Sequence, residues 1–336
     1  MEHRQWVSRY REELKGIAIL WVVYFHSKLL LPGAWDTLRA IGYGGVDIFL
    51  FLMGMGLFRS LSRGEELRGY ATRRLWRVLP AYLPLLLVWM AIMYPTYNLS
   101  TVQAARGVAG NLFMVGYWIQ TPKVFNWYAN AQFLFYLIAP LCFALLARSK
   151  RPVYMLCTLL AFSAGVGIAH IGLPQMMAVS RLPIFLLGMA FGMEWPVRAR
   201  RGVMRMVYIL ALVAGLGLLL YSLRAGDGLL IDYGMYWYPF ALITPALCVG
   251  ISYLFHKLER IVPLFMPLRV IGQSSFEIYI LNIWMVEVAK AQGVTDAWSW
   301  IGLCVANILL GIGYHTLVTW GVRTVRAKLT KPDTLA

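Results

Sequence analysis

Residues 41–58 read IGYGGVDIFLFLMGMGLF, and Asp47 is the only charged side chain in this stretch. An apolar run of this length is long enough to cross a bilayer as a helix. Similar runs recur along the chain, at about 16–32, 41–58, 78–94, 127–147, 153–171, 182–196, 206–223, 234–255, 275–291 and 299–320. The pattern predicts an all-α, polytopic integral membrane protein with about ten transmembrane helices.

The composition excludes several other classes of protein. Of 336 residues, 60% are hydrophobic and 14% are charged, whereas soluble globular proteins average about half and about a quarter. A soluble enzyme, a disordered chain and a soluble domain on a single anchor are therefore excluded. The runs are continuous and do not alternate, which argues against an outer-membrane barrel. The short apolar stretch Val108 to Ile119 is predicted to form a re-entrant or interfacial helix.

The distribution of Lys and Arg predicts the orientation. With the N-terminus inside, 24 of the 31 Lys and Arg residues fall in inside segments and 7 fall outside. The positive-inside rule then predicts an N-in, C-in topology and explains most of the net charge of +16 without nucleic acid. We expect one transmembrane domain over residues 1–336, with cytoplasmic ends at 1–15 and 321–336 and no appended soluble domain. The four scattered cysteines indicate neither a disulfide framework nor a metal site.

Ionisable side chains inside a span are costly, so each one suggests a function. His26 follows Lys15 by eleven residues, which places both on one face of a helix, about 16 Å apart. An imidazole in the membrane can accept a hydroxyl proton, although a packing histidine bonded to a backbone carbonyl fits equally well. Asp47 is predicted either to orient His26 or to cap a helix broken by the preceding glycines.

Other polar groups suggest where substrates bind. Arg73, Arg74 and Arg77 lie on adjacent turns and could hold phosphate groups, although topogenic charge alone would also place arginines there. The stretch 126–136 mixes amides and aromatics, which favours sugar binding or an aromatic belt. Arg181 could equally be an interfacial side chain that snorkels to water. His170 and His315 are expected to be structural. The predicted substrate-binding residues are Trp127, Tyr128, Gln132, Arg181, Glu277 and Asn282.

The order of these motifs resembles that of membrane-bound acyltransferase family 3, over nearly the whole chain. The first-span motif of that family is an Arg, ten residues and a His, and Lys15 and His26 stand at these places. The remaining matches are Gly45-Val46-Asp47-Ile48-Phe49, Arg74-Leu75-Trp76-Arg77, Trp127-Tyr128 with Phe135-Tyr136, Arg181-Leu182-Pro183 with Phe185-Leu186-Leu187-Gly188, and the region Gly272 to Leu281.

The resemblance implies transfer of an acyl group, usually acetyl, from cytoplasmic acyl-CoA to a carbohydrate hydroxyl at the bacterial inner membrane. His26 would be the catalytic residue, helped by Asp47, and Lys15, Arg73, Arg74 and Arg77 would hold CoA. The partners would be acyl-CoA, a carbohydrate or lipid-linked glycan and the bilayer, without metal or nucleic acid. The oligomeric state is open, including a homo-oligomer.

The sequence departs from the family pattern at three positions. Lys15 stands in place of Arg, Gln132 where many members carry Glu, and Asn282 where many carry a second His. The last two changes argue against a mechanism that needs a second acid or base. A transporter or flippase for a glycan, lipid or small solute, and a degenerate non-catalytic homologue, are the alternatives.

Overall fold

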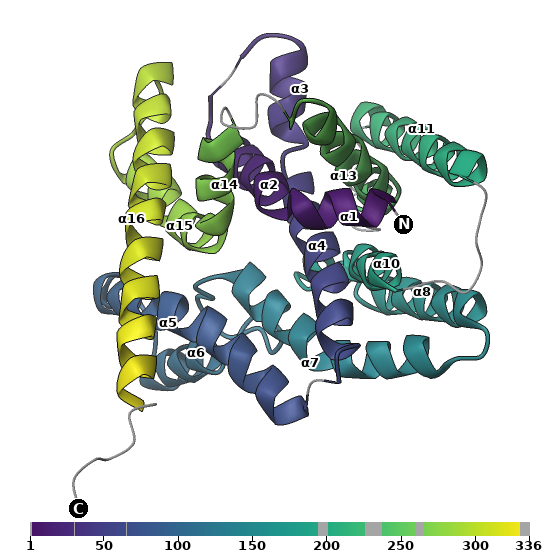
Figure 1. The fold of residues 1–336 in the computed structure, drawn as a ribbon. Helices are drawn as coiled ribbons and strands as arrows, with labels where there is room; N and C mark the ends of the chain where they lie inside the picture. Colours follow the sequence, from purple (N-terminus) through teal and green to yellow (C-terminus); the bar gives the residue numbers. More distant parts are fainter. Residues whose placement is uncertain are drawn as a thin grey trace, which may run out of the picture. The chain divides into compact units, whose positions relative to one another are not determined.

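The computed structural model describes residues 2–29, 31–64, 66–193, 201–225, 237–259 and 265–329, and helices are the regular elements of this part of the chain (Figure 1). The described residues fall into two compact units. Unit 1 takes residues from 1–22, 40–65 and 131–272, and unit 2 takes residues from 23–39, 66–130 and 273–336. Each unit is described by itself.

Unit 1 contains most of α2 and α7 and the helices from α8 to α14. Its helices are α1 (Glu2–Arg9), α2 (Arg11–His26), α4 (Gly44–Leu61), α7 (Trp127–Arg148), α8 (Pro152–Ala169), α9 (Met176–Val179), α10 (Leu182–Gly192), α11 (Arg201–Ala225), α13 (Pro239–Lys257) and α14 (Met266–Gln273).

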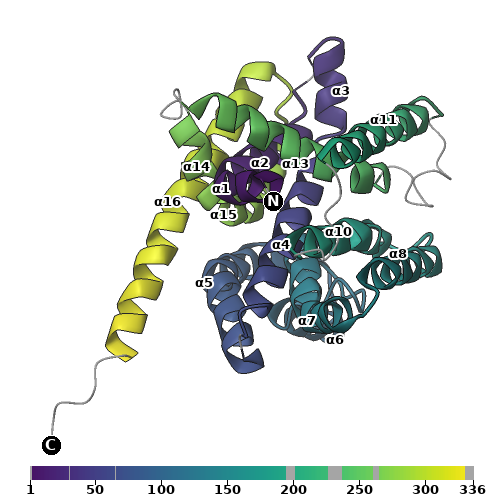
Figure 2. The ribbon, with the colours of Figure 1, turned by 45° about the vertical axis from the view of Figure 1, so that its right-hand side comes forward.

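Helix α4 is the core of unit 1, and it crosses α10 at very short range (Figure 1, Figure 2). A Cβ added at Gly54 would overlap the carbonyl oxygen of Phe185, and one added at Gly188 would overlap that of Phe51. Small residues at such crossings let helix backbones pack directly in a membrane protein. The glycines that the sequence places in the second span therefore join α4 to α10.

Glycines also let α2 pack directly against its neighbours in unit 1. Gly45 of α4 lies against the carbonyl oxygen of Ala18, and Gly272 of α14 lies against that of Glu12. An added Cβ at either glycine would come closer than 3.0 Å to these oxygens, a distance that real side chains essentially never show. The first predicted span is consequently held by backbone contact on two sides.

Unit 2 contains α5 (Leu67–Met93), the short 3-10 helix η1 (Tyr94–Thr96), α6 (Thr101–Leu112), α15 (Ser275–Ala291) and α16 (Ala297–Leu329), together with α3 (Ala34–Ala40). Gly311 of α16 packs on Ile278 of α15. Tyr314 of α16 donates a hydrogen bond to the carbonyl oxygen of Ala81 in α5 over 2.8 Å. Helix α16 therefore joins α15 to α5.

One buried amide organises the segment after α6. The Asn111 side chain is 0% exposed. Its Oδ1 accepts from the Phe125 N–H at 2.8 Å, and its Nδ2 donates to the carbonyl oxygens of Gly107 at 2.8 Å and Lys123 at 3.0 Å. The Tyr82 hydroxyl donates to the Asn111 carbonyl oxygen at 3.0 Å. Asn111 thus ties a loop with three non-glycine residues at positive φ to α6 and α5.

The all-helical, multi-pass prediction is confirmed for the described residues. In the part of the chain that the structure describes, seven helices are long and apolar enough to cross a membrane: Gly44–Leu61, Leu67–Thr96, Trp127–Arg148, Pro152–Ala169, Gly202–Ala225, Pro239–Lys257 and Ala297–Lys328. The total of about ten spans and the N-in, C-in orientation stay predictions.

Three predicted spans are shorter as helices than about 18 residues. Helix α2 ends at His26, so the expected run 16–32 is helical only in its first part. Helix α10 has 11 residues and ends at Gly192, and positions 194–196 of the expected run lie outside the described residues. Helix α15 has 17 residues. The re-entrant stretch is helical only to Leu112, because α6 begins earlier, at Thr101 after its Ser100 cap.

Candidate active site

Lys15 and His26 lie on one continuous helix, near its start and at its end. The Lys15 ammonium nitrogen is 2.5 Å from Glu12 Oε2, and Arg11 Nη2 is 2.9 Å from Glu12 Oε1. Burial would raise the pKa of the Glu12 carboxyl, but the charges and hydrogen bonds of Lys15 and Arg11 outweigh it and lower that pKa. Lys15 therefore belongs to a cationic pair held around one carboxylate at the start of α2.

His26 is the last residue of α2, so the helix does not carry it into the middle of a longer span. The Ser27 hydroxyl donates to the Tyr24 carbonyl oxygen at 2.7 Å, which satisfies a backbone acceptor where α2 ends. The His26 ring is half-buried and lies edge-on to Phe25, with centroids 5.0 Å apart. A histidine at a helix end has fewer neighbours on its own helix than one in mid-helix.

Asp47 and Arg181 form an ion pair inside unit 1. Arg181 Nε lies 3.4 Å from Asp47 Oδ2, and both side chains are 1% exposed. Arg181 also donates to the Met177 carbonyl oxygen, and its guanidinium carbon is 5.9 Å from the centroid of the Trp237 ring. The interpretation of Arg181 as a side chain snorkelling to water is wrong, because burial, the carboxylate and the Met177 carbonyl hold it in the protein interior.

The three arginines of the predicted phosphate site lie in the first turns of α5. Arg73 and Arg77 are exposed and one turn apart, and the Arg74 guanidinium carbon is 5.2 Å from the centroid of the Tyr70 ring. Guanidinium groups in this arrangement can each offer two parallel donors to a phosphate. The chemistry of this helix start suits a polyanionic ligand.

The aromatic start of α7 is largely packed inside unit 2. The Tyr128 ring is 6% exposed and lies 4.7 Å from the Tyr279 ring, centroid to centroid. Trp127 is half-buried, with its ring 6.0 Å from that of Tyr117. The neighbouring amide of Asn130 accepts from the Tyr117 N–H at 3.3 Å, so it supports the loop before α7.

Two buried amides at predicted substrate positions carry an oxygen that accepts no hydrogen bond from the described residues. Gln132, in unit 1, donates through Nε2 to the Tyr136 hydroxyl at 2.6 Å, but its buried Oε1 has no such partner. Asn282, in unit 2, is 3% exposed, and its buried Oδ1 likewise accepts no hydrogen bond from the described residues. A buried acceptor without a donor is costly, so each oxygen is chemically suited to a ligand hydroxyl.

Comparison with known families decides the class of this protein. The model of acyltransferase family 3, described as an acyltransferase domain, matches residues 12–316. The chain belongs to this acyltransferase family. No curated protein and no solved structure matches the chain.

The matched range runs through both units of the acyltransferase and contains every candidate residue described above. It also contains a contact that the sequence did not indicate. His315 Nδ1 of α16 lies 3.0 Å from Glu277 Oε1 of α15, whose side chain is 7% exposed. The two residues are 38 positions apart on different helices, so no spacing rule pairs them. In the described part of the acyltransferase, no three His, Cys, Asp or Glu side chains are grouped to hold a metal ion.

Proposed function

We propose that this acyltransferase moves an acetyl group from cytoplasmic acyl-CoA to a hydroxyl of a carbohydrate or lipid-linked glycan at the bacterial inner membrane. The observation that carries the proposal is the placement of Lys15 and His26 eleven residues apart on α2, in a chain that belongs to the acyltransferase family. The rise between them is about 16 Å, comparable to the length of a pantetheine arm. Both termini would be cytoplasmic, with the arginines of α5 on the CoA side.

The chemistry we propose is direct transfer. The His26 imidazole takes the proton of the acceptor hydroxyl while that oxygen attacks the thioester carbonyl carbon. The carbon–sulfur bond then breaks, CoA leaves as a thiolate, and the imidazolium returns its proton to the sulfur. Lys15, Arg73, Arg74 and Arg77 neutralise the CoA phosphates. In the main variant, the imidazole nitrogen attacks the thioester first and CoA leaves as a thiolate. The acceptor hydroxyl then attacks the acyl-His26 intermediate, and the imidazole leaves.

Asp47 keeps its catalytic role in this proposal, with its carboxylate held by Arg181. For the acceptor, we propose Trp127, Tyr128, Gln132, Arg181, Glu277 and Asn282. The buried amide oxygens of Gln132 and Asn282 support this assignment, because sugar hydroxyls are donors of the kind they lack among the described residues. The Tyr128 ring would shape the wall of the acceptor site, since it already packs on the Tyr279 ring.

The test is His26→Ala in proteoliposomes that contain labelled acetyl-CoA and the glycan fraction of the source membrane. General acid–base catalysis contributes roughly 100- to 10,000-fold, so the variant should lose at least 100-fold in acylation rate. His170→Ala is the matched control, because the His170 ring bonds the Val166 carbonyl oxygen at the end of α8 over 2.8 Å. A wild-type rate in His26→Ala refutes the mechanism. A transporter or a degenerate homologue would release no CoA in step with acylation.

A further inference from the structure

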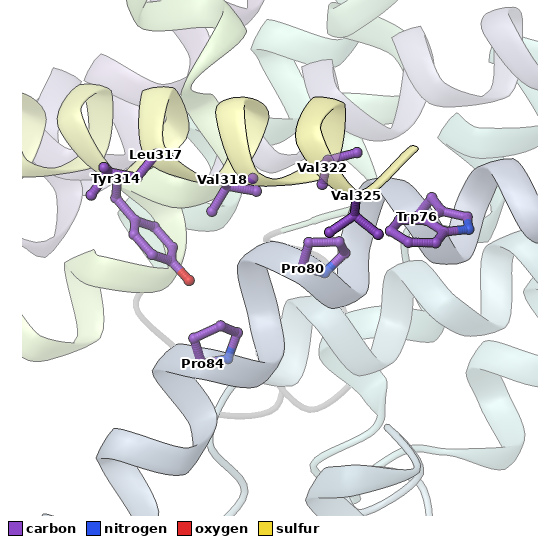
Figure 3. Close-up of a pocket in the computed structure, with 9 residues that line it drawn as sticks. Trp76, Pro80, Pro84, Tyr314, Leu317, Val318, Val322 and Val325 are labelled. Carbon is purple, nitrogen blue, oxygen red and sulfur yellow. The ribbon is translucent and has the colours of Figure 1, made fainter. Parts of the chain in front are cut away.

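An apolar groove runs between α5 and α16 within unit 2 (Figure 3). Its volume is about 310 Å³. Its walls are Trp76, Pro80 and Pro84 of α5, and Tyr314, Leu317, Val318, Gly321, Val322 and Val325 of α16. These nine residues include no charged side chain, and the Tyr314 hydroxyl already donates to the Ala81 carbonyl oxygen. The groove is therefore suited to a hydrocarbon chain.

The sequence explains why side chains do not fill this space. Pro80 and Pro84 stand four residues apart, so their compact rings share one face of α5 (Figure 3). Gly321 faces them without a side chain, and a Cβ added there would meet nothing within 4 Å in the described chain. Leu317 and Val325 are 65% and 44% exposed, so the groove opens toward the surroundings of the helices.

The length of the groove matches one leaflet of a bilayer. From Tyr314 to Val325, α16 rises about 16 Å, and half of a typical hydrocarbon core is about 15 Å. Both walls belong to helices long and apolar enough to cross a membrane, Leu67–Thr96 and Ala297–Lys328. A ligand that fills the groove would thus extend from the membrane surface to about the middle of the bilayer.

The charge at one end of the groove identifies the headgroup. Arg326 follows the lining residue Val325, and its guanidinium carbon is 5.4 Å from the centroid of the Trp76 ring. Arg323 lies three residues before Arg326, so both exposed guanidiniums are neighbours on α16. A guanidinium group can donate two parallel hydrogen bonds to the oxygens of one phosphate. Trp residues such as Trp76 are enriched at the level of the lipid headgroups.

We propose that the groove binds one anionic phospholipid of the leaflet on the arginine side, with an acyl chain along α5 and α16 and the phosphate at Arg323 and Arg326. An acyl chain gains little hydrophobic free energy by moving from the bilayer to a protein groove, because both are apolar. The headgroup charge therefore decides which lipid is bound. Lipid binding here does not rest on the proposed acyl transfer.

The test is native mass spectrometry of the full chain, purified in detergent doped with either phosphatidylglycerol or phosphatidylcholine of the same chains. One phosphatidylglycerol should stay bound where phosphatidylcholine is lost. Two guanidiniums near the membrane surface imply that Arg323→Gln/Arg326→Gln weakens phosphatidylglycerol binding roughly thirty-fold. Arg148→Gln/Arg151→Gln removes the same charge from exposed positions of unit 1 and should keep the binding.

A second pair of variants tests the hydrocarbon part. Gly321→Phe places a ring in the groove and should weaken retention of the lipid, because the acyl chain can no longer lie along α5 and α16 below the headgroup. Gly313→Phe puts the same ring on the same helix, at an exposed glycine that does not line the groove and whose added Cβ meets nothing within 4 Å in the described chain. Equal retention of both lipids, unchanged retention in Gly321→Phe, or displacement of phosphatidylglycerol by acetyl-CoA would overturn the proposal. The last outcome would make the groove a donor subsite.

Discussion

Breaking the buried pair of Asp47 and Arg181 on one side should strongly destabilise unit 1. For unit charges 3.4 Å apart, Coulomb's law with an effective dielectric constant near 20 gives about 5 kcal/mol of attraction. Removing one partner from a buried pair costs about 3–5 kcal/mol, because the other charge stays buried alone. Asp47→Asn should therefore lower the free energy of unfolding by about that amount, which is a factor of at least 100 in the folding equilibrium.

The measurement is reversible unfolding in mixed micelles, followed by tryptophan fluorescence. The control is Asp36→Asn, which removes a partly exposed pair with Arg39 at the shorter distance of 2.9 Å and should cost about 1 kcal/mol or less. The double variant Asp47→Leu/Arg181→Met should recover most of the stability, since it leaves no buried charge. If Asp47→Asn is as stable as Asp36→Asn, or if the double variant is as unstable as the single one, the reasoning fails. A catalytic Asp47 further requires that the recovered double variant stay inactive.

Three further predictions concern other contacts. Gly188→Leu should lower the free energy of unfolding by about 3 kcal/mol or more, because the new Cβ overlaps the carbonyl oxygen of Phe51 in α4. Gly165→Leu is the control, because a Cβ at Gly165 meets nothing within 4 Å in the described chain, and it should leave that free energy nearly unchanged. Equal effects of the two variants would contradict the packing argument. The Glu12 pKa is lower in the folded chain than its usual 4.5, so its contribution is full above pH 4.5 and is lost as the pH falls through the lowered value. Glu12→Gln should accordingly have a lower melting temperature than the wild type at pH 7 and the same melting temperature in acid. In a Lys15→Gln background, the effect of Glu12→Gln at pH 7 should be smaller. A difference in melting temperature that persists in acid would contradict this role of Glu12. Asn111→Ala leaves buried backbone groups without their hydrogen-bond partner and should destabilise the loop after α6 by about 3 kcal/mol. The measurement is limited proteolysis, which should cut residues 113–126 faster in the variant. Unchanged cleavage would refute the role of this amide.

The fold class could be predicted from the sequence, but the helix lengths could not. Apolar composition marks where the chain enters a membrane, and it predicted the helical, multi-pass architecture. It does not show where a helix stops. The expected run 16–32 contains an actual helix end at His26, and α10 is shorter than its apolar run. Helix ends depend on local hydrogen bonds to the backbone, such as the one that the Ser27 hydroxyl donates to the Tyr24 carbonyl oxygen, and composition does not report these.

The candidate site was predicted in its residue types but not in its pairings. Asp47 and Arg181 were singled out separately, yet their contact spans 134 positions and no local pattern links them. The same holds for Glu277 and His315, which are 38 positions apart; Glu277 was singled out as a substrate-binding residue and His315 as mainly structural. The Asn111 clamp was missed altogether. Its one sequence signal is an amide inside the short apolar stretch Val108 to Ile119, and this does not show which backbone groups the amide contacts.

The long separation of Asp47 and Arg181 in sequence has a consequence for the synthesis of the protein. At about 5–20 residues per second, the ribosome needs roughly 7–27 s to add the 134 residues between them. During that interval α4 must enter the membrane, or wait beside the insertion machinery, with an unpartnered carboxylate in its first turn, which disfavours insertion. A nascent chain truncated before Arg181 should therefore insert α4 poorly, and the emergence of α10 would complete the integration of a helix made well before it.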